Sequence, residues 1–476
     1  MIVVEPTSAD ILPGRGGWRR RWVVLGAVAA AAAVVAVALL MTRSGDGHPS
    51  AWDPRVADLV DFVEDERDLD FDHPVHVDFL SDEDFEDLVR ADEADLTEEE
   101  RADIEDGAAV LRALGLLGRD VDLFAAVNDL QGDGTLAFYD DTDERVRVRG
   151  TELTPALRST LVHELVHALQ DQHFDLSRLR EMEDGESAAF DALVEGDASR
   201  VATAYEETLS DEEREQIVEA EGRDQEELDV DRFPPFLSAS FGLPYVLGEP
   251  LVSIILEADG REGLDRAFRE PPSSDAALLD PLGFLEDDGT EEVDAQDLGE
   301  GETEIDSGEF GAVGLYLVLA HHLDVPRALS AASGWGGDSY LAYRSGDRVC
   351  VRATFVGDEP VDTDALRSAL RDWAAAMPAG WATVGDDGSA VTLTSCETDA
   401  DASPGDDVDV ERLMVLPASR SALAAQLLAQ GAPVEVAHCF TDRIILEFTL
   451  DELVASALTP EASARLERLA ASCRDA

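Results

Sequence analysis

The fold is decided by the stretch TPALRSTLVHELVHALQDQHFDL, residues 154–176. Thr154 is a favourable N-cap and Pro155 suits the first helical position, so the stretch predicts a helix over about residues 155–171. Apolar residues follow at the helical spacing i, i+3, i+4 and i+7: Val162, Leu165, Val166 and Leu169. The pattern predicts a helix with one buried side.

Two histidines of this helix lie outside the apolar stripe. At about 100° per residue, His163 and His167 are only about 40° apart around the helix axis, so both imidazoles can reach one ion. Glu164 stands beside them, and Asp171 flanks the same face. This spacing predicts a zinc site in which Glu164 handles a bound water. The alternative is a pair of packed histidines without a metal, but with nine histidines in the chain a chance HExxH has a probability of roughly one in fifty.

A zinc site needs a third protein ligand, and the first candidate is Glu195. It follows two apolar residues and precedes small ones, as expected in a helix that packs closely on another. It comes 28 residues after His167 (195 − 167), which leaves room for a loop and a returning helix. Asp191, one turn earlier, is the main alternative, followed by Glu186.

The charge balance of the chain is extreme. There are 104 Asp and Glu residues against 36 basic residues, all of them Arg, and the formal net charge is -68. Such a surface repels nucleic acid, so no nucleic-acid partner is expected. It suits a halophilic setting, because salt screens the self-repulsion. A hydrophobic content of 45% is sufficient for globular folding.

An apolar run near the N-terminus predicts a membrane anchor. Residues 23–41 are 19 consecutive apolar or Gly residues (41 − 23 + 1), long enough to cross a bilayer. Four arginines precede the run and one closely follows it: Arg15, Arg19, Arg20, Arg21 and Arg43. We therefore expect a single-pass cell-membrane protein with a cytoplasmic N-terminus and the bulk of the chain extracytoplasmic. A cleaved secretory signal is the alternative, and it also exports the chain.

Four cysteines fit an exported protein: Cys350, Cys396, Cys439 and Cys473. An even number in an oxidising compartment predicts two disulfides. Of the three possible pairings we favour neighbour pairing, Cys350 with Cys396 and Cys439 with Cys473, because it closes the shorter loops. Their spacing does not match a structural zinc knuckle.

The order of the segments predicts an α+β fold. A strand and a helix capped by Ser81 come first, a capping box at Thr97 and Glu100 opens the next helix, and a β-hairpin spans residues 135–150. Residues 286–308 read as an exposed acidic loop, and GWGGD (334–338) as a turn. We expect the following organisation: a cytoplasmic tail (1–21), a transmembrane helix (22–42), a linker (43–55), a catalytic domain with a small N-terminal sheet and a helical lobe (56–337), and a smaller disulfide-bearing α+β domain (338–476).

Several segments resemble a known enzyme family. HELVHALQDQHFDL (163–176), preceded by AFYDDTDERVRVRG (137–150) and followed by LVEGDA (193–198), resembles the zincin metallopeptidases, and the later Glu is gluzincin-like. Three further segments resemble a bacterial family of membrane-anchored metallopeptidases predicted from sequence: FGLPYVLGEPLV (241–252), REPPSS (269–274) and GWGGD (334–338).

The resemblance implies a zincin-like domain holding one zinc ion on His163, His167 and Glu195, with Glu164 as general base. It also implies that the hairpin supplies an edge strand which binds an extended peptide. Many gluzincins carry Asp one turn after the ligand Glu, where this chain has Ser199.

Two supporting roles stay open at this point. Asp171 or Asp197 would supply the carboxylate that orients a ligand. Tyr245 and His173, together with Tyr205, are candidates for the donor that stabilises the transition state.

The leading hypothesis is a membrane-anchored, extracytoplasmic zinc metalloendopeptidase that hydrolyses peptide or protein substrates through a zinc-activated water. A non-catalytic surface module with a structural or vestigial zinc site is the first alternative. An acidic binding protein in which HExxH is incidental is the second, and it predicts no stoichiometric metal.

Overall fold

The computed structural model describes residues 47–91, 93–182, 184–228, 232–285, 289–386, 388–398, 410–449, 452 and 459–474. The predicted cytoplasmic tail and transmembrane helix lie outside these residues. The chain divides into two compact units. Unit 1 comprises residues 1–108, 120–183 and 190–245, and unit 2 comprises residues 109–119, 184–189 and 246–476. Helices and two separate sheets make the fold α+β, as the sequence predicts.

Unit 1 contains a three-stranded sheet with the order β1-β3-β2. Its strands are β1 (His76–Leu80), β2 (Ala137–Asp140) and β3 (Arg145–Arg149). β1 is parallel to β3, and β2 is antiparallel to β3, with Tyr139 opposite Val146. The predicted hairpin is therefore confirmed, and β2 is an edge strand among the described residues.

Helices make up the rest of unit 1, and α4, α7 and α9 also contribute residues to unit 2. Their bounds are α2 (Ala57–Arg67), α3 (Asp82–Val89), η2 (Glu93–Asp95), α4 (Glu98–Ala113), α5 (Leu123–Gly134), α6 (Pro155–Phe174), η3 (Leu176–Arg180), α7 (Asp184–Thr208), α8 (Asp211–Leu228) and α9 (Pro235–Arg269). The predicted N-caps are confirmed: Ser81 Oγ accepts from Asp84 N, and Thr154 Oγ1 accepts from Leu157 N. Thr97 and Glu100 form the predicted capping box.

The core of unit 1 is built around α6. Its apolar stripe packs against α2, β2, β3 and α7, and Val162, Leu165, Val166 and Leu169 are fully buried. The other side of the helix is also covered, since every residue from 161 to 170 is buried. The helix is therefore buried all round its middle, whereas the sequence pattern predicted one buried side.

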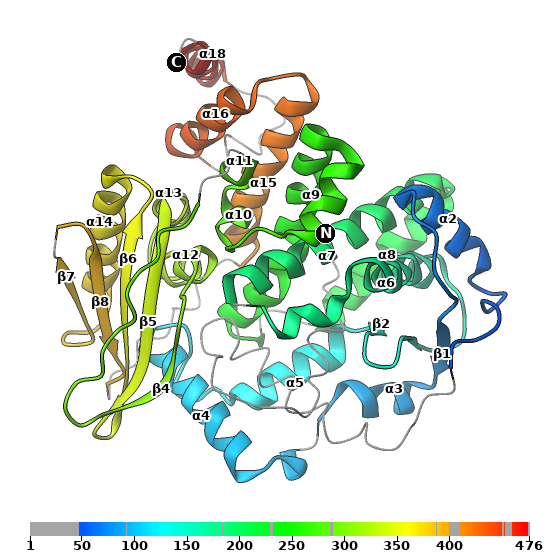
Figure 1. Ribbon diagram of the computed structural model, residues 1–476, viewed down its shortest axis with the longest axis horizontal. Coiled ribbons are helices and arrows are strands. Elements are labelled where there is room, and N and C mark those ends of the chain that lie inside the picture. The colour runs from blue at the N-terminus through cyan, green and yellow to red at the C-terminus, as the bar shows by residue number, and fades with distance from the viewer. Residues whose placement is uncertain are drawn as a thin grey trace. The chain divides into compact units, whose positions relative to one another are not determined.

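Unit 2 contains a five-stranded, wholly antiparallel sheet with the order β4-β5-β6-β8-β7 (Figure 1). Its strands are β4 (Glu302–Gly308), β5 (Trp335–Ser345), β6 (Arg348–Gly357), β7 (Ala382–Asp386) and β8 (Val391–Cys396).

Two predictions from the sequence are wrong in this region. Residues 302–308 of the predicted loop form the edge strand β4, and GWGGD opens β5 with Trp335 buried instead of forming a turn. The expected domain boundary at residue 337 falls inside β5.

The helices of unit 2 are α10 (Ala276–Leu279), α11 (Pro281–Leu285), α12 (Ala312–Ala320), α13 (Val325–Ala332), α14 (Pro360–Ala376), α15 (Val410–Ala429), α16 (Val434–Glu447) and α18 (Pro460–Arg474). Helix α14 packs on β6, β7 and β8.

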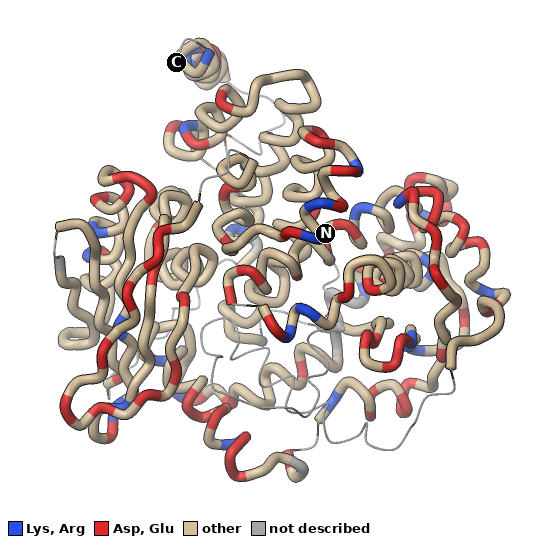
Figure 2. Tube along the Cα trace, viewed as in Figure 1, with Lys and Arg blue, Asp and Glu red and all other residues tan. Residues whose placement is uncertain are grey.

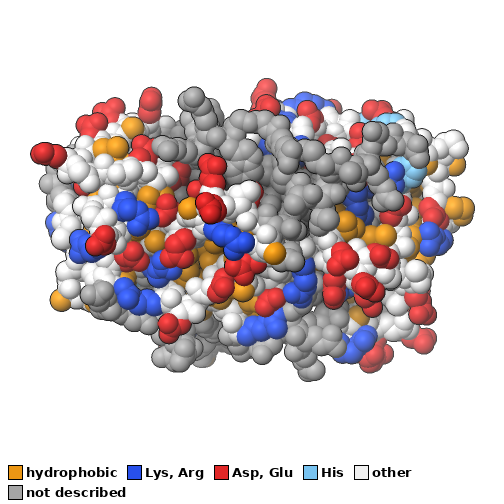
Figure 3. All heavy atoms as spheres, turned by 90° about the horizontal axis from the view of Figure 1, so that it is seen from below, with side chains coloured by type: hydrophobic (Ala, Val, Ile, Leu, Met, Phe, Trp, Pro, Cys, Tyr) orange, Lys and Arg blue, Asp and Glu red, His pale blue; other side chains and the backbone are white. Residues whose placement is uncertain are grey.

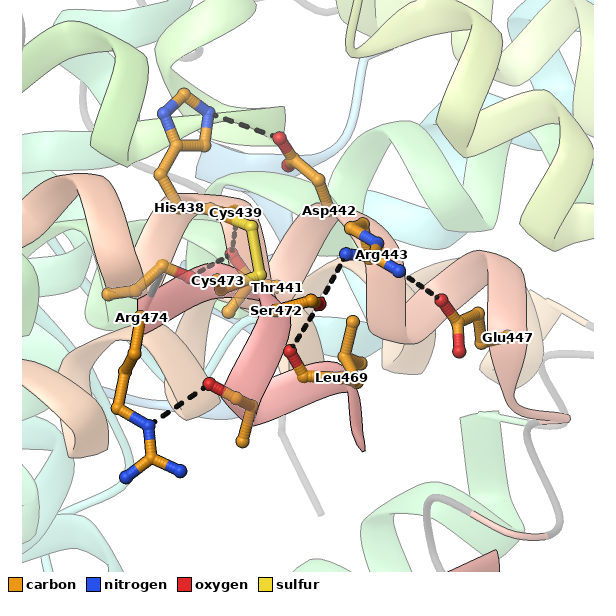
Figure 4. The surroundings of a disulfide bond; sticks show 12 residues. His438, Cys439, Thr441, Asp442, Arg443, Glu447, Leu469, Ser472, Cys473 and Arg474 are labelled. Atoms are coloured by element: carbon orange, nitrogen blue, oxygen red, sulfur yellow. Dashed lines mark hydrogen bonds and ion pairs between the residues drawn. A yellow bond between two sulfur atoms is a disulfide. The ribbon is translucent and has the colours of Figure 1, made fainter. Parts of the chain in front are cut away.

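Both predicted disulfides are present. Cys350–Cys396 joins directly paired positions of β6 and β8, and Cys439–Cys473 joins α16 to α18 (Figure 4). Beside the second disulfide, His438 Nε2 lies 2.8 Å from Asp280 Oδ2 and 3.5 Å from Asp442 Oδ2.

Within the described residues, α9 is the one helix long and apolar enough to cross a membrane. Of its most apolar window, 56% is buried inside the protein, as is common for a core helix. Gly260 interrupts the helix with φ 66° and ψ -166°, so α9 consists of two helices joined at a kink.

The acidic residues are spread widely over both units. Figure 2 shows Asp and Glu along nearly every part of the described chain. On the face drawn in Figure 3, arginine side chains lie among the acidic ones. This dispersed pattern is typical of general solvation of the surface, because a binding site for one cationic partner would concentrate the charge.

Candidate metal centre

Two helices bring the HExxH histidines and Glu195 together in unit 1. His163 and His167 lie on α6, and Glu195 lies on α7. The Nε2 atom of His163 is 3.1 Å from Oε2 of Glu195, and Nε2 of His167 is 3.7 Å from the same oxygen. The two rings are perpendicular, with centroids 4.6 Å apart. One oxygen of Glu195 therefore faces Nε2 of both histidines.

The spacing of these atoms fits a zinc ion. Two ligand atoms, each about 2.0–2.1 Å from a tetrahedral zinc ion, are about 3.3 Å apart, which lies between the two observed distances. Two imidazoles and a carboxylate are also a donor set that zinc accepts. The residues present could hold this metal.

His167 is oriented by a buried polar chain. Its Nδ1 lies 3.0 Å from Oε1 of Gln170. The Gln170 amide nitrogen donates to Val194 O and to Oδ2 of Asp197, both at 3.1 Å, so Oε1 is the atom that faces the ring. His167 must then carry its proton on Nδ1, which leaves the Nε2 lone pair directed at Glu195.

Asp197 is in turn neutralised by a buried arginine. Nε of Arg67, the last residue of α2, lies 2.7 Å from Asp197 Oδ2, and the two side chains are 1% and 0% exposed. Arg200 also approaches Asp197, at 3.4 Å, and pairs with Glu66. Residues of α2, α6 and α7 thus form one polar network behind His167.

Burial keeps both histidines in the neutral form that binds metals. Burial lowers the pKa of His163 well below its usual value, and the neighbouring His167 lowers it further. Burial also lowers the pKa of His167, to about 4, although the hydrogen bond that the ring donates to Gln170 and the charge of Asp197 oppose this shift. At neutral pH each ring is therefore uncharged and keeps one nitrogen lone pair that can bind a metal.

Glu164 lies beside the edge strand. Its Oε2 accepts a 2.6 Å hydrogen bond from the backbone N–H of Tyr139, in the middle of β2. As a whole residue Glu164 is 2% exposed, against 7% for His163, 2% for His167 and 1% for Glu195. The candidate base therefore lies between the two histidines and the edge strand β2, and all of these residues are buried.

The other predicted residues are placed as follows. Asp171 accepts from the Tyr139 hydroxyl and from the N–H of Leu176, so it links α6 to β2 and to the start of η3, and Gln170 takes the orienting position at His167. Tyr245 lies over His163, with ring centroids 6.2 Å apart and an interplanar angle of 25°. His173 is exposed, and its Nε2 contacts Asp70 O.

Three further assignments from the sequence have a place in the structure. The hydroxyl of Tyr205 accepts a hydrogen bond from Arg158. Asp191, the alternative third ligand, is half-buried on α7. Ser199 is also half-buried, and the carboxylate behind the site comes from Asp197.

Sequence reasoning missed three residues of this site. Gln170 lies three residues after His167, so helical spacing alone offered a signal for it. Tyr139 precedes His163 by 24 residues (163 − 139), and Arg67 precedes His167 by 100 residues (167 − 67). No local pattern predicts such contacts, because they depend on how α2 and the hairpin pack on α6.

Comparison with known proteins gives one match. A family model described as a domain of unknown function (DUF8575) matches residues 297–419. This range contains the whole five-stranded sheet of unit 2 and none of α6. No curated protein and no solved structure matches the chain.

Proposed function

We propose that the protein is a zinc-dependent metalloendopeptidase of the zincin type. The observation that carries the proposal is the convergence of Nε2 of His163 and Nε2 of His167 on one oxygen of Glu195. Glu164 on the same helix is held by Tyr139, at the edge of a sheet. The proposal is supported by the closeness of His163, His167, Glu195, Glu164 and an edge strand within one unit of the described chain.

The chemistry follows from the positions of the chain's own groups. A bound zinc ion supplies a water that is acidic near neutral pH and polarises a carbonyl group. Glu164 takes the proton of the attacking water and passes it to the leaving amine. Tyr139 N–H keeps Oε2 of Glu164 oriented during both transfers. Tyr245, stacked on His163, is the nearest of the expected donors to the site and would stabilise the oxyanion.

Substrate binding is assigned to the free edge of β2. Peptide groups alternate between the two sides of an antiparallel strand. Leu136 O accepts from Arg149 N, so Leu136 faces β3, and Ala137 and Tyr139 direct their N–H and C=O groups to the other side. An extended peptide would pair with Ala137 and with the carbonyl group of Tyr139, whose N–H is held by Glu164, and would pass beside Glu164. The strand is buried, so a substrate is admitted only when the covering chain moves.

The proposed place of the enzyme is the outer face of a cell membrane, with the N-terminal apolar run as anchor. The two disulfides agree with export, because such bonds persist in oxidising compartments. The charge of -68 favours a medium of high ionic strength.

The test compares variants of the full-length chain, purified in detergent and high salt. Zinc content is measured by elemental analysis, and hydrolysis is measured on a peptide library by mass spectrometry. Glu164→Gln should keep its zinc and lose about 10²–10⁴-fold in rate. Glu195→Gln should lose zinc, whereas Asp191→Asn should keep it. Glu152→Gln, on an exposed residue, serves as the control for both measurements.

One observation supports a structural zinc site as the second candidate. A Glu164 oxygen and one nitrogen of each histidine lie within 4.8 Å of one another, so Glu164 could itself be a ligand in this closed interior. Loss of zinc in Glu164→Gln, with no cleavage by the wild type, would support that reading. A wild type without stoichiometric zinc after repletion would refute both candidates.

A further inference from the structure

A second group of metal-binding side chains lies in unit 1, apart from the HExxH site. Nδ1 of His48 is 3.4 Å from Oε2 of Glu144, and Nε2 of His73 is 3.5 Å from the same oxygen. The two imidazoles are stacked, with centroids 3.5 Å apart and an interplanar angle of 27°. One carboxylate oxygen therefore faces one nitrogen from each of two rings.

These distances argue against an ordinary ion pair. A charge-assisted hydrogen bond from imidazolium to carboxylate is about 2.7–2.9 Å long, clearly shorter than both contacts. Two protonated rings stacked this closely would also repel each other. Ligand atoms around a tetrahedral zinc ion are about 3.3 Å apart, close to both observed distances.

The glutamate oxygen at the centre of the group supports the same reading. Oε2 of Glu144 is shielded from solvent and accepts no hydrogen bond among the described residues. A buried carboxylate oxygen that lacks a donor is costly, and a cation between it and the two rings would satisfy it. We propose that His48, His73 and Glu144 bind a second divalent transition-metal ion, zinc being the best match to two imidazoles and one carboxylate.

Neighbouring groups hold the His73 ring in place. Nδ1 of His73 lies 3.4 Å from Pro74 O and 3.5 Å from the amide nitrogen of Gln172, and Nε2 is the nitrogen that faces Glu144. Gln172 of α6 accepts from His73 N and donates to His73 O. The ring is thereby held from the helix that also carries the HExxH histidines.

The three ligands come from separate segments, which gives the ion a structural task. His48 belongs to the arm before α2, His73 to the segment before β1, and Glu144 to the turn between β2 and β3. An ion bound to all three clips the arm to the hairpin. Because Gln172 of α6 is hydrogen-bonded to the backbone of His73, the bound ion would also be connected to α6. This role does not depend on peptidase activity.

The experiment counts zinc in full-length protein purified in detergent and high salt, stripped with chelator and reloaded. Excess Mg²⁺ occupies the surface carboxylates without competing for imidazole. We expect two zinc ions per chain in the wild type and one in the His48→Ala/His73→Ala double variant. His76→Ala, which changes a nearby histidine outside the group, should keep two. The His163→Ala/His167→Ala variant should keep one.

A residue-level measurement accompanies the count. In the His163→Ala/His167→Ala variant, zinc should slow acylation of His48 and His73 by diethylpyrocarbonate and lower hydrogen exchange in residues 47–53. Zinc content that is the same with and without His48 and His73 would overturn the second site. Loss of zinc only in His48→Ala/His73→Ala would instead overturn the first site and keep the second, so the two proposals fail separately.

Discussion

His167 and Gln170 are joined by a 3.0 Å contact between Nδ1 of the ring and Oε1 of the amide, both buried on α6. This contact determines which ring nitrogen faces Glu195. The polar chain behind it continues through Asp197 to Arg67. The proposed metal affinity is therefore sensitive to residues that touch no metal.

Replacing Gln170 by Leu should weaken zinc binding about 10–100-fold, because His167 loses the partner that sets its tautomer and orientation. Competition titration with a chromogenic chelator measures the dissociation constant. Gln216→Leu, on an exposed position of α8, is the matched control. Equal zinc affinity in Gln170→Leu and the control would show that the amide does not position His167.

Arg67→Met should destabilise unit 1 by about 3–5 kcal/mol, since it leaves Asp197 charged and buried with only the more distant Arg200 to compensate. The additional change Asp197→Leu should recover much of this loss, because no uncompensated charge remains. Thermal unfolding in high salt, followed on the full-length protein, compares the two variants. A double variant no more stable than Arg67→Met would argue that the ion pair is not the source of the effect.

Unit 2 should lose stability as the pH rises from about 4 towards 7. The side chains of Asp275, before α10, and Asp338, in β5, reach the start of α12. There they accept hydrogen bonds from the backbone N–H groups of residues 310–313. Burial nevertheless raises the pKa of each to about 7, from an ordinary value of 3.8. The folded state then binds these two protons more tightly than the unfolded state. The stability that this difference contributes is complete below pH 3.8 and is lost as the pH rises to about 7.

Denaturant unfolding, followed by the fluorescence of buried Trp335 between pH 4 and 8, measures this slope. Asp338→Asn should flatten it by up to about 1.4 kcal/mol per pH unit. Asp347→Asn, exposed between β5 and β6, should leave it as in the wild type. The same slope in all three proteins would contradict the assignment.

Removing the Cys439–Cys473 disulfide should release α18 from α16. The bond closes a loop with a sequence separation of 34, for which chain entropy gives about 4 kcal/mol. Cys439→Ser/Cys473→Ser should therefore show faster hydrogen exchange throughout α18. In Cys350→Ser/Cys396→Ser, β6 and β8 should stay protected, because their backbone hydrogen bonds remain. Unchanged exchange in α18 would show that its packing alone holds it.

The sequence by itself determined the local elements of this protein. Thr154 and Pro155 begin a helix wherever its partners lie, and the spacing of His163 and His167 follows from the helical repeat. Loop length favoured neighbour pairing of the cysteines among three possible pairings, and the structure decided for it. These features depend on residues near one another in the chain or on simple chain statistics.

Only the tertiary structure decided which distant groups meet. The apolar and small neighbours of Glu195 favoured it over Asp191 as a ligand, but only the packing of α7 on α6 brings its carboxylate to both histidines. The same holds for Arg67 behind Asp197 and for Glu144 between His48 and His73. Such contacts join segments whose relative positions are set by the burial of apolar faces, and the polar residues themselves carry no pattern that records the outcome.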